Sequence, residues 1–141
     1  MNLEYFDGAV TSAATFSSSG NLTIAGTYFP TSDKDAKENF RKLDPAEILA
    51  KVLAMPVTRW NYKTSPATQH IGPVAQDFHA AFGVGVDNRH ISTTDADGVA
   101  LAAIQGLDAK VAEENRKLRA ENEALRERLG RLEKAVEALT K

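Results

Sequence analysis

Two residues near the N-terminus have side chains that together could break a peptide bond. Ser32 and Lys37 stand five positions apart, in the segment Ser-Asp-Lys-Asp-Ala-Lys. A serine hydroxyl is a poor nucleophile by itself, and a neutral lysine amine that takes its proton can activate it. Ser32 and Lys37 are therefore candidates for a catalytic dyad, with the serine as nucleophile and the lysine as general base.

The same segment has a second interpretation, the start of a helix. A serine cap with an acidic residue three positions later fits the capping-box pattern loosely, because Asp35 stands where Glu or Gln is preferred. On one helix, side chains five residues apart point about 140° away from each other. A dyad therefore requires Ser32 in extended chain and Lys37 inside the turn that follows. It also requires burial or a neighbouring cation that favours the neutral amine, and spacing alone leaves both interpretations open.

The histidine, cysteine and glycine content of the chain indicates no metal site and no nucleotide site. His70, His79 and His90 do not have metal-ligand spacing, and the chain contains no cysteine, which excludes disulfides and thiolate ligands. Gly83 and Gly85 lack the third glycine and the following helix of a dinucleotide-binding loop. We therefore expect no metal and no cofactor.

Composition and charge limit the class of protein. The 141 residues are 43% hydrophobic and 26% charged, as in a soluble folded protein with one modest domain and an appendage. The net charge of -2 gives no general attraction for nucleic acid. No apolar run approaches the roughly 20 residues of a membrane span. We expect neither nucleic acid nor a membrane as a partner.

The residues that precede the dyad are typical of short β-hairpins. Residues 1–31 are rich in Gly, Ser, Thr and Ala, and a Gly20-Asn21 turn signal separates Phe16 from Leu22. So small a β segment cannot bury a core alone. We expect it to be the end of a longer β-rich protein or a strand donor in an oligomer.

Two short helices are predicted after the dyad. Asp44 as the cap and Pro45 at the first helical position open one helix, which ends before Pro56. The other follows residues 72–73 and ends at Gly83. Both helices carry apolar residues at helical spacing.

A strand is predicted between these helices. Residues 57–62 alternate so that Trp60 and Tyr62 share one face. We expect the core to take both aromatic rings.

The last third of the chain predicts one long helix from about residue 97 to residue 139, with a coiled-coil seam. Apolar residues recur there every seven positions, at Ile104, Val111, Leu118, Leu125, Leu132 and Leu139. With these as d positions, the a positions are Asp108, Asn115, Asn122, Leu129 and Val136, and the g to e′ pairs are Glu114 with Arg119, Glu121 with Arg126 and Arg128 with Glu133. Opposite charges in every pair favour parallel, in-register copies of one chain. Leucine at d with asparagine at a by itself favours two strands.

Several separate stretches of the chain match the sequence motifs of one known family, in the same order. They are Thr31-Ser32-Asp33, residues 37–40, residues 60–63, residues 70–78, residues 95–107 and the terminal coiled coil. Together they resemble the endosialidase-type intramolecular chaperone domain of phage tail fibres and tailspikes. Ser32 and Lys37 fall where that family has its dyad.

The resemblance implies a homotrimer, rather than the dimer that the seam alone favours. In such a protein the domain helps to fold the β-rich fibre ahead of it and then releases itself by cutting between Thr31 and Ser32. It would act as a self-cleaving serine endopeptidase, once and in cis, in a virion tail fibre whose precursor is assembled in the host cytoplasm. His70, Asp33 and Gln76 are candidates for supporting roles near the dyad.

The sequence therefore predicts an α+β fold with short N-terminal β-hairpins, a small mixed helix and strand domain, and a long C-terminal helix in a parallel trimeric coiled coil. The expected domains are residues 1–31 as the end of a fibre stem, 32–103 as chaperone and autoprotease, and 104–141 as coiled coil. One alternative is a structural trimerisation module that does not cleave. Another is a leucine-zipper regulator, but that needs a basic helix before the zipper, and residues 86–107 contain one arginine and no lysine.

Overall fold

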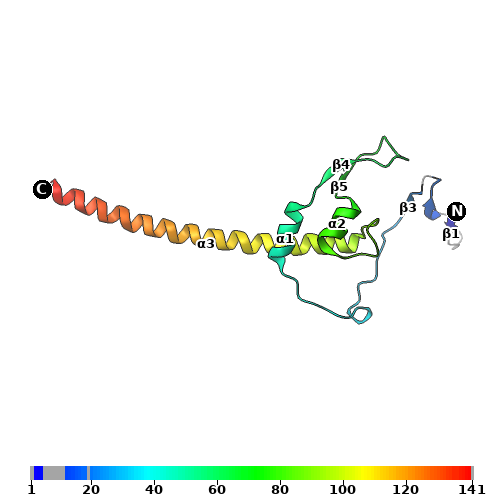
Figure 1. Cartoon of the computed structure of the whole chain (residues 1–141), viewed down its shortest axis with the longest axis horizontal. Coiled ribbons are helices and arrows are strands. Elements are labelled where there is room, and N and C mark those ends of the chain that lie inside the picture. The colour runs from blue at the N-terminus through cyan, green and yellow to red at the C-terminus, as the bar shows by residue number, and fades with distance from the viewer. Residues whose placement is uncertain (1, 5–11, 19, 141) are drawn as a thin grey trace. The chain divides into compact units, whose positions relative to one another are not determined.

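The computed structural model describes residues 2–4, 12–18 and 20–140. The chain forms two compact units, one made of residues up to 41 with residues 58–72, and one made of residues 42–57 with residues 73–141. The fold is α+β as predicted, with small antiparallel hairpins and a long C-terminal helix (Figure 1).

The first unit contains a three-stranded antiparallel sheet in the order β1-β2-β3. Its strands are β1 (Asn2–Glu4), β2 (Ser12–Phe16) and β3 (Leu22–Ile24). Gly20, at a φ of 85° that favours glycine, lies in the turn between β2 and β3, and Phe16 pairs with Leu22 across it. The predicted hairpin around Gly20-Asn21 is confirmed, while residues 1, 5–11 and 19 of the predicted β segment lie outside the described residues. The side chains of Phe16, Leu22 and Ile24 are exposed, so the large apolar residues described in β2 and β3 form no buried core.

A second hairpin pairs β4 (Thr58–Trp60) with β5 (His70–Gly72) in antiparallel register, with Trp60 opposite His70. The strand is shorter than the predicted residues 57–62. The Trp60 and Tyr62 rings do lie together, edge to face at 5.0 Å. The expectation that the core takes both was wrong, because the strand ends at Trp60 and Tyr62 stays 58% exposed beside the rings of Trp60 and His70.

The second unit contains three helices. They are α1 (Pro45–Ala54), α2 (Ala75–Phe82) and α3 (Thr93–Leu139). Asp44 caps α1 by accepting a hydrogen bond from the Ala46 N–H, and Gly83 ends α2 in the left-handed conformation, both as predicted. The helix α3 begins earlier than residue 97, because the Ser92 hydroxyl oxygen accepts a hydrogen bond from the Asp95 N–H.

The helix α1 lies across the N-terminal part of α3 (Figure 1), and the crossing depends on Gly106. A Cβ atom at position 106 would collide with the Pro45 carbonyl oxygen and lie 2.7 Å from the Pro45 carbonyl carbon. Ala102 and Ala103 beside it are buried, as is Leu49 of α1. Small residues on this face of α3 therefore let the two helix backbones approach closely.

The opposite face of α3 carries the predicted seam. At 100° per residue, the a and d positions between 101 and 111 lie about 170° around the helix from the residues that contact α1. This apolar stripe is exposed along the whole helix, with Val111 at 44% and Leu139 at 87% as the extremes. Its members are Leu101, Ile104, Val111, Leu118, Leu125, Leu129, Leu132, Val136 and Leu139. Of the helices in the described part of the chain, none has the length and hydropathy to cross a membrane.

The crossing generates a prediction about stability. Gly106→Ala forces a methyl group into the Pro45 backbone and should destabilise the fold by about 1–3 kcal/mol, the usual cost of overpacking. Gly130→Ala is the matched control, because nothing lies within 4 Å of a Cβ placed there, and it should stabilise α3 by up to about 1 kcal/mol through helix propensity. Thermal unfolding followed by circular dichroism at equal protein concentration measures both. A rise in Tm for Gly106→Ala would contradict the close crossing.

Candidate functional site

The side chains of Ser32 and Lys37 are in direct contact. The Lys37 Nζ donates to the Ser32 Oγ at 2.7 Å, although the two residues are five apart in sequence. This separation lies within the range of about 2.6–3.2 Å that relates a nucleophile to its base, and it also lets a neutral amine accept the hydroxyl proton. Both residues are exposed in the single chain. The arrangement has the geometry of a dyad.

A single tight turn brings these side chains together. The turn η1 (Lys34–Ala36) is a 3-10 helix that Asp33 caps, its carboxylate accepting a hydrogen bond from the Asp35 N–H at 3.0 Å. Lys37 ends the turn in extended conformation and donates its backbone N–H to the Lys34 carbonyl. The helix-start interpretation with Ser32 as the cap was wrong, because Asp33 occupies that position. The turn brings the two side chains into contact as a dyad needs, but Lys37 ends the turn instead of lying inside it, and it is exposed in the single chain, so the required burial is not met there.

The peptide bond ahead of Ser32 lies in exposed chain without helix or strand. Thr31 is exposed, and so are large apolar residues on both sides of the dyad, with Tyr28 at 69%, Phe29 at 85% and Phe40 at 67%. Such residues gathered in one exposed segment indicate a surface that contacts another protein surface. After the dyad, Asn39 has a φ of 57°, a left-handed conformation that asparagine tolerates better than most residues.

His70 takes part in an aromatic cluster. Its ring stacks on Trp60 with centroids 4.8 Å apart and meets the edge of Tyr62 at 5.4 Å. No hydrogen bond joins His70 to Ser32 or Lys37 in the part of the chain that the structure describes. The Trp60 Nε1 is buried there without a hydrogen-bond partner, which is uncommon for a buried donor. Sequence reasoning missed this cluster, because only the hairpin register places His70 opposite Trp60.

The remaining supporting candidates have different positions. Asp33 lies between the two dyad residues in sequence, and its carboxylate caps η1 by accepting a hydrogen bond from the Asp35 N–H. Gln76 is exposed in the first turn of α2, in the second unit.

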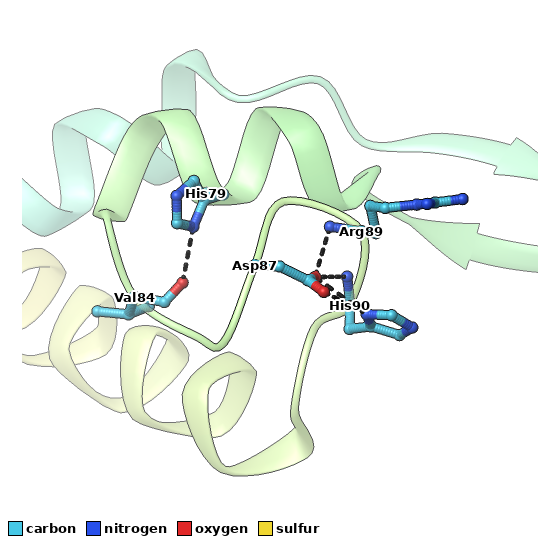
Figure 2. Close-up of polar contacts among 5 residues, drawn as sticks. All are labelled: His79, Val84, Asp87, Arg89 and His90. Carbon is cyan, nitrogen blue, oxygen red and sulfur yellow. Dashed lines mark hydrogen bonds and ion pairs between the residues drawn. The ribbon is translucent and has the colours of Figure 1, made fainter.

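The other two histidines hold the loop between α2 and α3 (Figure 2). The His79 Nδ1–H donates to the Val84 carbonyl at 3.1 Å, and the His90 Nδ1–H donates to the Asp87 carboxylate at 2.9 Å. The backbone N–H of Arg89 and the His90 side chain, in that order, hold the pKa of Asp87 below its usual value. In residues 2–4, 12–18 and 20–140, no three His, Cys, Asp or Glu residues gather in a way that could hold a metal.

Comparison with known families identifies the dyad-bearing segment. Residues 32–87 match a peptidase family described as the chaperone of endosialidase. The match begins at Ser32 and contains Lys37 and both short helices. Among curated proteins, none matches the chain. The resemblance inferred from the motifs is therefore confirmed, and the family supports a chaperone role and a self-cleaving peptidase activity.

The loop between α2 and α3 provides a test by pH. Since the pKa of Asp87 is lowered on folding, its contribution to stability is present at neutral pH and is lost as the pH falls through the folded-state pKa. NMR titration of the Asp87 carboxyl carbon should give a midpoint below that of an unstructured Asp, and Asp87→Ala should lower the Tm slightly at pH 7, by an amount that shrinks as the pH falls through that midpoint. An ordinary midpoint would contradict the hydrogen bonds of this carboxylate.

Proposed function

We propose that this chain, which carries a domain of the chaperone of endosialidase family, trimerises, helps to fold the β-rich end of a phage tail fibre or tailspike, and then cuts itself between Thr31 and Ser32. The observation that carries the proposal is the 2.7 Å contact between Ser32 Oγ and Lys37 Nζ, at the residue where the family match begins.

The cleavage is an acyl transfer within one residue. The Ser32 Oγ attacks the carbonyl carbon of Thr31 while the Lys37 amine takes the hydroxyl proton. The C–N bond between Thr31 and Ser32 then breaks, and the lysine returns the proton to the leaving nitrogen, which becomes the amino group of Ser32. The ester that remains joins the Thr31 acyl group to the Ser32 oxygen, and water hydrolyses it to a Thr31 carboxylate and a free hydroxyl. Because the nucleophile is bonded to the residue it releases, effective concentration supplies much of the acceleration.

The exposure of the dyad indicates when the reaction occurs. A lysine works as a base only where desolvation or a nearby cation favours its neutral form, and Lys37 is exposed in the single chain. The exposed Phe29 and Phe40 on either side of the dyad are surfaces that a neighbouring chain could cover. Cleavage therefore depends on assembly, as a folding checkpoint requires.

The free seam of α3 supports the assembly. Because α1 packs on the opposite face, the apolar stripe from Leu101 to Leu139 is available along its whole length. In the described part of α3, the ion pairs within the helix join Glu113 with Arg116 and Lys117, and Glu127 with Arg131, all outside the e and g positions. The charged e and g residues are thus available to bridge parallel, in-register copies.

The resemblance favours three copies, and one contact weakens the argument for two. The Asn122 side-chain amide donates to the Leu118 carbonyl of its own helix at 2.8 Å. That bond provides a partner for the amide without a second asparagine across the seam, which is the pairing that would select a dimer.

The domain boundaries follow from this function. Residues 1–31 would remain with the fibre as its end, residues 32–103 would form the chaperone and autoprotease, and residues 104–141 the coiled coil. The start of the family match at Ser32 supports the first boundary. The precursor would assemble in the host cytoplasm and its β-rich product would be part of the virion tail fibre.

A structural trimerisation module without cleavage is the second candidate function. The observation that favours it is the exposure of Lys37 in the single chain. The next experiment separates the two candidates.

The dyad predicts a defined pattern of cleavage. The wild-type chain should yield residues 1–31 and 32–141, while Ser32→Ala and Lys37→Ala should each stay intact, since each removes one reacting group. Lys37→Arg should also stay intact, because a guanidinium remains protonated. Lys34→Arg, in the same turn, is the matched control and should be cut normally. Intact-mass measurement decides, and normal cleavage of Ser32→Ala or Lys37→Arg would remove the dyad from the mechanism.

The seam predicts that assembly and cleavage fail together. Leu125→Asp places an unpaired charge in the seam, at a cost of about several kcal/mol, so the variant should be monomeric and uncut. Ala124→Asp, one position away on the outer face, should still form a cleaved trimer. Sedimentation measures the oligomer and intact mass the cleavage. A wild-type dimer would refute the trimer, and cleavage of monomeric Leu125→Asp would show that the dyad works in one chain.

A further inference from the structure

We infer that Asp33 is a positioning residue for the self-cleavage, acting through the hydrogen bond by which its carboxylate caps the turn and not through its charge. This inference rests on the proposed function of the dyad. It assigns to one side chain the task of bringing Lys37 to Ser32.

The dyad contact depends on a conformation that regular structures do not supply. Five residues in extended chain span about 17 Å, whereas the Ser32 Oγ and Lys37 Nζ are 2.7 Å apart. In an α-helix the two side chains would point about 140° apart. Only a compact turn with extended chain on both sides, as η1 has, makes the contact.

Asp33 makes two of the hydrogen bonds that hold this turn. Its carboxylate accepts from the Asp35 N–H at 3.0 Å, and its backbone carbonyl accepts from the Ala36 N–H at 3.3 Å. No residue of η1 is buried, so packing does not hold the turn. A single exposed 3-10 turn is marginal by itself, and a side-chain cap then determines how often it forms.

The charge of Asp33 has no favourable part in the reaction. The ion pairs of the described residues do not include Asp33 with Lys37. Such an ion pair would favour the ammonium form of the lysine, which cannot act as a base. The side chain is therefore useful as a hydrogen-bond acceptor, and a neutral acceptor of the same shape should replace it.

Two substitutions separate the acceptor from the charge. Asp33→Asn keeps an oxygen for the Asp35 N–H, and Asp33→Ala removes it. In cell-free translation of the full chain, with the cut fraction followed by mass spectrometry over time and pH, Asp33→Asn should cut within about threefold of the wild-type rate. Asp33→Ala should be slower by about two- to thirtyfold, the range by which loss of a cap shifts a helix equilibrium. The midpoint of the pH profile should be the same in all three chains, because the base is unchanged.

A second measurement tests the cap without cleavage. In the Ser32→Ala chain, the backbone NMR chemical shifts of residues 34–36 should move toward random coil when Asp33→Ala is added and stay in place with Asp33→Asn. Equal slowing by both substitutions, a shifted pH midpoint, or a wild-type rate in Asp33→Ala would overturn the inference. If the wild-type chain is never cut while the chemical shifts still respond to Asp33→Ala, the proposed function fails and the cap is structural only, which also overturns the positioning role.

Discussion

The described part of the chain exposes more large apolar side chains than it buries, and the rest of the structure depends on this imbalance. Within the described residues the buried hydrophobic side chains are Leu49, Phe78, Ala102 and Ala103, and two of these are alanines. A core of that size contributes little against the conformational entropy of folding. The proposed assembly would add stability by covering the exposed apolar side chains, chiefly the seam of α3.

The contact of α1 with α3 makes that arrangement possible. Because Gly106 has no Cβ, α1 packs closely on one face of α3 and the seam remains free on the other. The helix α1 is thereby held on the side of α3 that faces away from the seam. The chain thus combines a helix with an exposed apolar seam and the segment of the chaperone family match.

Local patterns were predicted well, and contacts that depend on pairing or on assembly were not. Asp44, Gly83 and the Gly20 turn were readable because caps and turns are set by residues adjacent in sequence. The spacing of Ser32 and Lys37 suggested a catalytic dyad. It could not predict where the turn between them begins, since either Ser32 or Asp33 can act as its cap. The exposure of Tyr62 and the stack of His70 on Trp60 depend on strand length and register, which alternation of residue types does not fix.

The confinement of Ser32 and Lys37 to six consecutive residues has a consequence for timing. Groups so close in sequence meet as soon as one turn forms, on the time scale of the fastest folding events, and much faster than the proposed association of chains would be. The contact between the two side chains therefore cannot determine when a reaction at this dyad begins. In the proposed mechanism water would control it instead, because it solvates the exposed Lys37 of each unassembled chain. A partner chain that excludes this water would start the reaction, and hydration would protect every unassembled precursor from premature loss of its own chaperone.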